Sequence, residues 1–294
     1  MDEIKFSVII PTYNRADFIG NAINSVLNQI YSQLELIVVD DGSTDNSKEV
    51  INKILKQDSR VKLITLEKNY GRCIARNKGI KTASADWICF LDSDDFYYDN
   101  HLQTFADLII KFPDQYAFAT SQIHKGIVGD AFLSGSKSVY NFIKLEDNIK
   151  CNPLSVNQLC YNYEKNKVLF PDENIPISED WIFMRQLTLK SPILKVNIVT
   201  NEINEHADRT VNVSPITELA RWNYYGAVYF IKNNIVEKKI KSLILSHTLL
   251  LCTNMLLSSK MKRESLKYLF KALHFTCSFW NILLFKAIIK YLKP

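Results

Sequence analysis

Three aspartates, Asp92, Asp94 and Asp95, directly follow the apolar segment of residues 87–91. Crowded carboxylates repel one another unless a positive charge lies between them. The usual partner of such a cluster is a hard divalent cation, which prefers oxygen ligands. The spacing therefore indicates a metal and diphosphate site. The alternative is an Asp-rich turn that only caps the next helix.

Three earlier segments also end in polar residues: Tyr13 and Asn14 after residues 6–10, Asp40 and Asp41 after residues 34–39, and Asn69 after residues 61–66. Each segment is short and apolar, which is typical of a buried strand. The stretches between them place apolar residues three and four apart and predict helices. This alternation predicts a parallel sheet with helices on both faces, whose strand ends meet at one crevice.

The bulk composition limits the class of protein. The chain has 294 residues, of which 47% are hydrophobic and 23% charged, which is ordinary for one large or two smaller globular domains. Its six cysteines form no Cys-x-x-Cys pair, which fits a reducing compartment without disulfides or a zinc site. The segment 1–5 lacks the features of a signal peptide, so we expect a cytoplasmic protein.

Several other classes of site are not supported. The first strand is followed by residues 11–14 (PTYN) rather than by Gly-x-Gly-x-x-Gly, and no Gly-Lys-Ser/Thr loop occurs. The chain therefore has neither a dinucleotide fingerprint nor a P-loop. A receiver-like signalling module also gathers acids at strand ends. It would place its phosphoacceptor aspartate after the third strand, where residues 67–69 (EKN) stand.

Four ordered motifs resemble those of family 2 of the glycosyltransferases, which are inverting enzymes with a GT-A type fold. The matching segments are residues 7–14 (SVIIPTYN), 35–43 (ELIVVDDGS), 69–77 (NYGRCIARN) and 90–95 (FLDSDD). The resemblance thins out towards residue 215 and then stops. It implies an α/β fold of GT-A type, with a mostly parallel Rossmann-like sheet flanked by helices and a C-terminal helical extension.

The resemblance also implies a domain organisation. Residues 1–215 would form the GT-A catalytic domain, with a nucleotide-sugar-binding half at 1–99 and an acceptor-binding half at 100–215. Residues 216–294 would form a basic helical C-terminal extension.

Five residues acquire nucleotide-sugar-binding roles from the resemblance. Pro11 and Tyr13 would flank the nucleotide base, and Asp41 would accept a hydrogen bond from the imide N–H of uracil. Arg72 would approach the base or the diphosphate, and Asp92 would face the ribose or the outer shell of a metal. For Tyr13, the alternative is a packed ring in a loop.

The resemblance implies that Asp94 ligates Mn²⁺ or Mg²⁺, which would stabilise the charge on a leaving diphosphate. Some relatives carry a metal-contacting histidine near the end of the domain, so His206 is a second candidate ligand and Arg209 a candidate diphosphate contact. A structural histidine is the alternative. We favour structural roles for Arg76, as an ion pair, and for Asp40, at a sheet end or helix cap.

Residues 177–187 resemble the family's Glu-Asp motif, whose aspartate is the catalytic base. Asp180 would therefore take the proton from the acceptor hydroxyl. Glu179 and Trp181 would bind the acceptor, the latter by stacking on a sugar face. The alternative is that Ser178 caps a helix, the two acids stabilise its first turn, and Trp181 is a core aromatic.

The C-terminal segment is strongly basic, with 12 basic and 2 acidic residues from Lys232 onward. Its periodicity predicts helices at 216–232, 238–258, 263–274 and 279–293. The last of these would carry a basic stripe beside a broad apolar face, which is typical of a membrane-surface helix. The alternatives are a cap on the catalytic domain or a homo-dimer interface. No nucleic-acid-binding motif accompanies the charge, so we expect no nucleic acid partner.

We therefore predict an inverting, metal-dependent hexosyl- or N-acetylhexosaminyltransferase. It would move a sugar from a nucleotide sugar, UDP-linked in our interpretation, to a hydroxyl of a growing bacterial polysaccharide or lipid-linked oligosaccharide. The enzyme would be cytoplasmic and peripheral on the inner face of the plasma membrane. The alternatives are an inactive nucleotide-sugar-binding protein and a sugar nucleotidyltransferase, which would need a Gly-rich loop where residues 11–14 stand.

Overall fold

The computed structural model describes residues 3–125, 139–173, 175–206 and 214–275. Their contacts divide the chain into two units. The sheet unit comprises the described residues of 1–144, 154–174 and 187–206, and the helical unit those of 145–153, 175–186 and 207–294. Two short middle segments thus group with the C-terminal helices, whereas the sequence suggested a single boundary at residue 215.

The described part of the sheet unit is built on a nine-stranded mixed sheet. Its strand order is β3-β2-β1-β4-β8-β6-β9-β5, and β7 pairs with β9. The first four strands are β1 (Phe6–Thr12), β2 (Leu34–Asp40), β3 (Val61–Thr65) and β4 (Trp87–Phe90). They are mutually parallel, as the strand–helix alternation predicts. Every residue of β1 and β2 is buried, which explains their nearly continuous apolar sequences.

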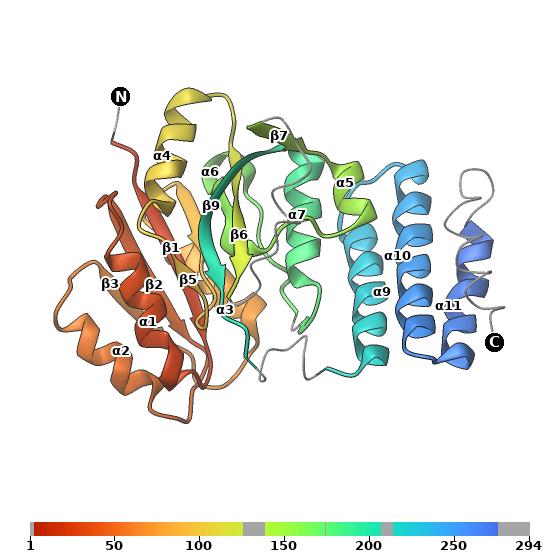
Figure 1. The fold of residues 1–294 in the computed structure, drawn as a ribbon, viewed down its shortest axis with the longest axis horizontal. Helices are drawn as coiled ribbons and strands as arrows, with labels where there is room; N and C mark the ends of the chain where they lie inside the picture. Colours follow the sequence, from red (N-terminus) through yellow and green to blue (C-terminus); the bar gives the residue numbers. More distant parts are fainter. Residues whose placement is uncertain (1–2, 126–138, 174, 207–213, 276–294) are drawn as a thin grey trace. The chain divides into compact units, whose positions relative to one another are not determined.

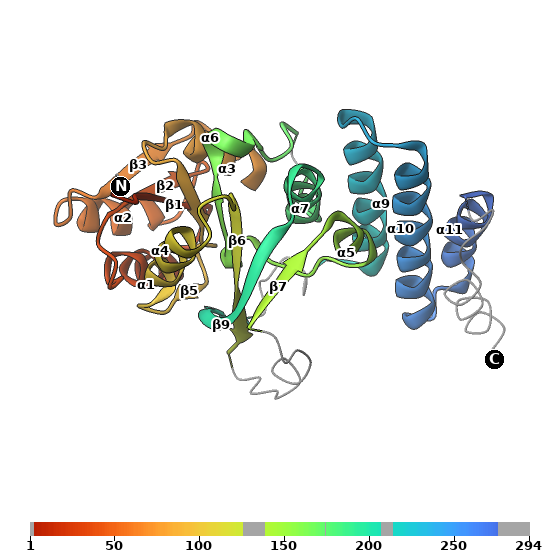
Figure 2. The same ribbon diagram turned by 90° about the horizontal axis from the view of Figure 1, so that it is seen from above.

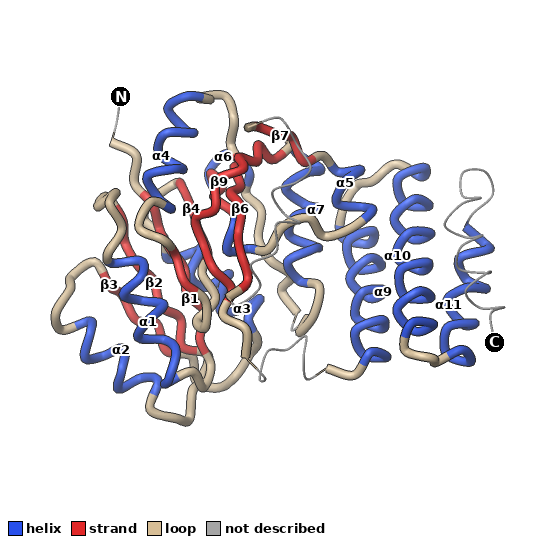
Figure 3. The backbone as a smooth tube through the Cα atoms, viewed as in Figure 1, coloured by secondary structure: helices blue, strands red, loops and turns tan. Residues whose placement is uncertain are grey.

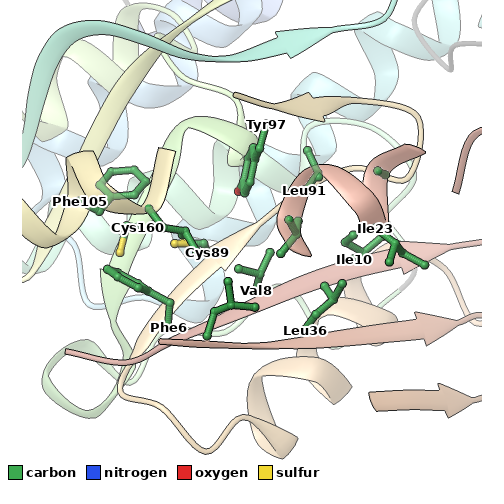
Figure 4. Close-up of a cluster of buried hydrophobic side chains, with 14 of the residues drawn as sticks. Phe6, Val8, Ile10, Ile23, Leu36, Cys89, Leu91, Tyr97, Phe105 and Cys160 are labelled. Carbon is green, nitrogen blue, oxygen red and sulfur yellow. The ribbon is translucent and has the colours of Figure 1, made fainter. Parts of the chain in front are cut away.

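Helices cover both faces of this parallel half (Figures 1 and 2). The helices are α1 (Ala16–Leu27), α2 (Ser47–Leu55), α3 (Arg72–Thr82) and α4 (His101–Lys111). The apolar sides of α1 and α4 share one core with Val8, Leu36 and Cys89 of the strands (Figure 4). On the opposite face, α3 packs closely on β1, because a Cβ at Gly79 would lie 2.5 Å from Ile9 Cγ2.

The second half of the sheet departs from the parallel pattern. Its strands are β5 (Phe96–Tyr97), β6 (Ala117–His124), β7 (Tyr140–Ile143), β8 (Leu159–Asn162) and β9 (Ile193–Ile203). Strand β8 runs antiparallel to β4 and β6, and β9 is antiparallel to β5 and β7. Residues 152–158, which precede β8, form a loop and the short 3-10 helix η2 (Val156–Gln158). The short helix α6 (Tyr163–Asn166) follows β8.

The described part of the helical unit consists of helices and loops (Figure 3). Its elements are α5 (Leu145–Lys150), the first part of α7 (Glu179–Lys190), α9 (Ile216–Asn233), α10 (Lys238–Ser258) and α11 (Lys262–Phe275). The predicted helices 216–232, 238–258 and 263–274 are thereby confirmed. The predicted helix 279–293, with its basic stripe, lies outside the described residues.

By length and composition, α10 is apolar enough to cross a membrane, with a mean hydropathy of 1.5. However, 56% of its apolar window is buried in the protein, and α10 packs between α9 and α11. The central helix of a soluble helical bundle has the same properties, since it is apolar on most sides.

Candidate active site

The sheet register brings the predicted strand-end residues to one edge. Thr12 pairs with Asp40, and Asp40 pairs with Thr65. The ladder between β1 and β4 stops at the pair Ile9 and Phe90. Because all four strands are parallel, the loops that follow them leave the sheet on the same side. The four strands therefore end at one edge of the sheet, as the sequence predicts.

Pro11 explains why β4 ends where it does. Leu91 donates its N–H to the carbonyl of Ile9, at 3.1 Å. In an evenly spaced parallel ladder, the next bond would come from the N–H of residue 11. Proline has no N–H, so the ladder cannot continue, although β1 itself runs on through Pro11 to Thr12. The chain after β4 is thus free to turn away at the aspartate cluster.

Asp41 holds two strand-end loops together. Its carboxylate accepts hydrogen bonds from the backbone N–H groups of Tyr70 and Gly71, both at 2.8 Å, and the residue is 3% exposed. The neighbouring Gly42 has φ +76, and a Cβ there would lie 2.5 Å from the carbonyl carbon of Lys68. Each oxygen of Asp41 keeps a second lone pair, so the carboxylate can still accept a hydrogen bond from a base N–H.

The other predicted base-binding residues lie around Asp41. Tyr13 follows β1 and is 41% exposed, so its ring is accessible. The next residue, Asn14, has φ 51 and accepts the N–H of Thr44 at 2.9 Å, which fixes this loop against the one after β2. Arg72 is the first residue of α3, directly after Gly71.

Asp40 and Arg76 have the structural roles that we favoured. The buried carboxylate of Asp40 accepts the N–H of Ser43 and lies 3.5 Å from Lys48 Nζ. Arg76 is 1% exposed and donates from Nη2 to Asp92 Oδ1 at 2.7 Å. The Asp92 side chain is 31% exposed, so the ion pair has its cation inside and its carboxylate at the surface.

Asp94 and His206 are brought together across 112 positions of sequence. His206 Nε2 lies 2.9 Å from Asp94 Oδ2, and the two side chains are 13% and 15% exposed. Two residues that sequence reasoning missed complete this cluster. The ring of Phe18 stacks on the imidazole, with 5.0 Å between centroids, and Arg15 Nε lies 3.6 Å from the same Asp94 oxygen. Arg15 follows the first strand within three residues, so the strand-end rule applied to basic residues would have found it.

Asp95 has a structural role, but it is not a helix cap. Its carboxylate accepts hydrogen bonds from Asn157 Nδ2 at 2.6 Å and from the N–H of Asn204 at 3.0 Å. It therefore ties the end of β4 to η2 and to the end of β9. The capping alternative is wrong because β5 follows the aspartates and α4 begins only at His101.

The aspartate–histidine cluster fits a divalent cation in part. Within the described ranges, no group of three or more His, Cys, Asp or Glu side chains could hold a metal. Asp94 and His206 supply one carboxylate and one imidazole whose donor atoms already converge. Mn²⁺ and Mg²⁺ favour oxygen ligands and commonly complete their shell with substrate phosphates and water. The pair suits such an open site. Arg209 lies outside the described residues.

Asp180 belongs to the helical unit, in the first turn of α7. Its Oδ1 accepts the N–H of Trp181 at 2.7 Å, and its Oδ2 accepts from Asn152 Nδ2 at 2.9 Å. Ser178 has φ 72, its hydroxyl donates to Asn223 Oδ1 of α9 at 2.7 Å, and its carbonyl accepts the N–H of Ile182 in the first turn of α7.

Glu179 and Trp181 lie in the core of the helical unit, with exposures of 4% and 5%. Trp181 Nε1 donates to the carbonyl of Asn148, and the guanidinium of Arg185 lies 4.0 Å from the Trp181 ring centroid. Burial lowers the pKa of Arg185 to about 9. Because the indole is covered, the core-aromatic alternative for Trp181 fits the structure better than stacking on a sugar.

Comparison with known proteins identifies relatives of this chain. The model of glycosyl transferase family 2 matches residues 7–189. The Escherichia coli protein WfgD, a UDP-Glc:alpha-D-GlcNAc-diphosphoundecaprenol beta-1,3-glucosyltransferase, is 36% identical over 165 residues, which cover 55% of this chain and 64% of WfgD. The chain spans between 20% and 64% of the length of the first four curated relatives that it matches.

Solved structures share the fold. S. aureus TarS 1–349 in complex with UDP-GlcNAc superposes with a TM-score of 0.73 at 22% identity, covering 98% of this chain and 88% of that one. The mannosyltransferase PcManGT from Pyrobaculum calidifontis, in complex with GDP-Man and Mn²⁺, gives a TM-score of 0.62 at 16% identity and covers 99% and 81%. The predicted α/β fold of GT-A type, with helices after the sheet, is confirmed.

Proposed function

Because the chain belongs to glycosyl transferase family 2, we propose that it transfers a sugar, with inversion, from a UDP-sugar to an acceptor hydroxyl. The observation that carries this proposal is the convergence of Asp94 and His206 at 2.9 Å, at the edge where the loops after β1, β2, β3 and β4 leave the sheet. The name of WfgD includes UDP-Glc, and TarS was solved in complex with UDP-GlcNAc, which supports uridine as the base.

The sheet unit would bind the donor. The exposed ring of Tyr13 offers a face to the uracil, beside the backbone around Pro11, and a free lone pair of Asp41 would accept the imide N–H. Asp92, whose side chain is 31% exposed beside Arg76, would accept a hydrogen bond from a ribose hydroxyl. Arg72, at the start of α3, would approach the diphosphate or the base.

Asp94 and His206 would hold Mn²⁺ or Mg²⁺, and such a cation neutralises charge that develops on the diphosphate. Phe18 would keep the imidazole of His206 in place through the stacked contact. Arg15, 3.6 Å from Asp94, adds a positive charge at the same point and would pair with diphosphate oxygens.

The helical unit would supply the base. Asp180 would take the proton from the acceptor hydroxyl as that oxygen attacks the anomeric carbon, and the nucleoside diphosphate would leave with the bonding electron pair. The N-terminal end of α7 favours a negative charge at this position. Asn152 would orient the carboxylate through its 2.9 Å hydrogen bond. We leave the buried Trp181 out of the proposed acceptor site, and we assign Glu179 a supporting role in the core.

A donor screen tests this function. The full chain would be incubated with Mn²⁺ and a panel of UDP-, GDP- and dTDP-sugars, and the release of nucleoside diphosphate would be measured. We expect hydrolysis or transfer with one or more UDP-sugars. Binding without any turnover, with or without saccharide acceptors, would favour the inactive nucleotide-sugar-binding protein. Release of pyrophosphate from a nucleoside triphosphate and a sugar phosphate would favour the nucleotidyltransferase.

We further propose that the acceptor is carried on a lipid and that the helical unit contacts the inner face of the plasma membrane. WfgD, a relative, has a diphosphoundecaprenol-linked acceptor in its name. In this chain, the turn between α9 and α10 presents a fully exposed Ile235 among the exposed lysines Lys232, Lys238 and Lys239. An apolar tip within a basic surface suits an anionic lipid headgroup layer.

A further inference from the structure

An open pocket of about 280 Å³ lies between α1 and β5, within the sheet unit. Its walls include three asparagines of α1 and its C-terminal end, together with Phe96 and Asp99 from the β5 segment; the asparagines are Asn21, Asn24 and Asn28. None of these residues belongs to the proposed donor site. The pocket therefore needs an explanation of its own.

Polar side chains line the pocket, although most of its exposed lining is apolar. The spacing of three and four places the asparagines on one side of α1, and all three are exposed. Among the described residues, none forms a hydrogen bond with the side-chain amides of these asparagines or with the carboxylate of Asp99. Asparagine is a poor helix former, costing roughly 0.5 kcal/mol relative to alanine. Helix stability therefore gives no reason for Asn21 and Asn24.

Hydrogen bonds beneath the pocket hold its two walls in place. Ser25 Oγ accepts the N–H of Tyr97 at 3.2 Å. One turn further, Gln29 donates from Nε2 to the carbonyl of Tyr98 at 2.7 Å and accepts the N–H of Leu102 at 2.9 Å. Because α1 and the β5 segment are joined by buried bonds, the pocket is preformed and a ligand would not have to organise it.

The chemistry of the lining selects a class of ligand. Each amide offers two donors and one acceptor, and Asp99 offers only acceptors, which together suit a set of hydroxyl groups. Phe96 is 42% exposed and provides an apolar ring face. No lysine, arginine or histidine of the described residues lines the pocket, and Asp99 would repel an anion, so phosphates and nucleotides are disfavoured.

We propose that this pocket is a second binding site, for a neutral saccharide unit. Its ring would stack on Phe96 while its hydroxyls hydrogen-bond to the asparagine amides and Asp99. Phe96 follows the metal candidate Asp94 by two residues, so a saccharide here would lie beside the donor site. We therefore assign the pocket to a sugar of the acceptor that does not itself react. This assignment rests on the proposed function, whereas the proposed binding of a saccharide to the pocket does not.

The test measures saccharide binding without nucleotide or metal. The ¹⁵N-labelled full chain would be titrated with the methyl glycosides of glucose, galactose, mannose and N-acetylglucosamine, and amide NMR shifts would be followed. We expect shifts in residues 21–29 and 96–99 with at least one glycoside. The variants Phe96→Ala and Asn24→Ala should each weaken binding about fivefold or more. The matched controls are Phe142→Ala, at an aromatic ring that is 56% exposed in β7, and Asn52→Ala on α2; both should bind like the wild type.

Two results would overturn the proposal: no glycoside shifts the pocket signals, or Phe96→Ala and Asn24→Ala both bind like the controls. Asn24→Ala is on the helix surface, so it remains informative if Phe96→Ala does not fold. The donor screen separates this proposal from the enzymatic one. Turnover without saccharide shifts would reject only the pocket, whereas saccharide shifts without turnover of any nucleotide sugar would reject only the proposed function.

Discussion

The strand-end cluster of the sheet unit and the start of α7 in the helical unit hold their carboxylates in different ways. In the sheet unit, Asp41 accepts hydrogen bonds from the amides of Tyr70 and Gly71, in a loop that follows another strand. In the helical unit, Asp180 accepts from the amide of the next residue, Trp181, and from Asn152, which lies 28 positions away. Both regions therefore use a partner from a distant segment, and the start of α7 adds a bond to its own first turn.

The substitution with the largest expected effect separates catalysis, assigned to the helical unit, from donor binding, assigned to the sheet unit. Asp180→Asn removes the proposed base while keeping the size of the side chain. Because general base catalysis contributes about 10²–10⁴-fold, we expect kcat to fall by roughly 10³-fold with unchanged affinity for the UDP-sugar. Measurement of kcat, together with calorimetric measurement of the affinity for the UDP-sugar, would show whether turnover falls while binding is unchanged. Asp114→Asn, at an exposed position of the sheet unit, is the control. Near-wild-type turnover in Asp180→Asn would remove the base assignment.

The second effect concerns the metal. Asp94→Ala deletes the carboxylate that converges with His206, so we expect the affinity for Mn²⁺ with UDP to fall by about 10–100-fold. Calorimetric titration of UDP with and without Mn²⁺ measures this directly. His206→Ala should weaken the same Mn²⁺ dependence, because it removes the other half of the pair. If Mn²⁺ dependence is unchanged in both variants, the contact between Asp94 and His206 has no role in metal binding.

Acid should destabilise the two units through different histidines. Burial lowers the pKa of His101 to about 3 in the sheet unit, whereas burial and the charges of Lys150 and Arg185 lower the pKa of His247 to about 4 in the helical unit. The unfolded chain binds these protons near pH 6.5, so stability is lost as the pH falls below that value. For His101 the loss at pH 5 is about 2 kcal/mol.

Amide hydrogen exchange at pH 7, 5 and 4 would measure the pH dependence of stability in each unit separately. His101→Gln should flatten the pH dependence of protection in the sheet unit only, and His247→Gln that in the helical unit only. If the protection of all protected amides depends on pH in the same way, and either variant removes this dependence everywhere, the two units unfold together.

The smallest expected effect tests the membrane contact. Ile235→Asn removes an exposed apolar side chain whose burial in lipid is worth about 1.5–3 kcal/mol, so binding to phosphatidylglycerol vesicles should weaken about tenfold. Vesicle sedimentation measures this, with phosphatidylcholine vesicles as the uncharged reference. Ile110→Asn changes an isoleucine of the sheet unit that is 61% exposed, and should leave binding unaltered. Equal binding to both kinds of vesicle would argue against a role for the lysines.

The parallel half of the fold was predictable because its signals are periodic and local. Residues 6–10, 34–39 and 61–66 are short buried strands, and α1 to α4 show one apolar side each. The second half of the sheet was not predictable, since β5 and β7 are too short to show alternation, and the apolar residues Leu154 and Val156 lie in a loop and in η2 rather than in a strand.

The candidate site shows the same contrast. The strand-end rule placed Asp41, Asp92 and Asp94 at one edge, because parallel strands end together. It could not show that both oxygens of Asp41 bind the backbone, nor that the Trp181 indole is covered by Arg185. Such contacts depend on the packing of distant segments. The Asp95 contacts with Asn157 and Asn204 span 62 and 109 positions, and no local pattern announces them.

Pro11 limits the length of the pairing between β1 and β4. Any other residue at this position would restore an N–H opposite Leu91 and allow one more rung between the two strands. That rung would draw the start of the aspartate turn into the sheet. The missing main-chain N–H at Pro11 thus keeps the aspartates in a loop rather than in a strand.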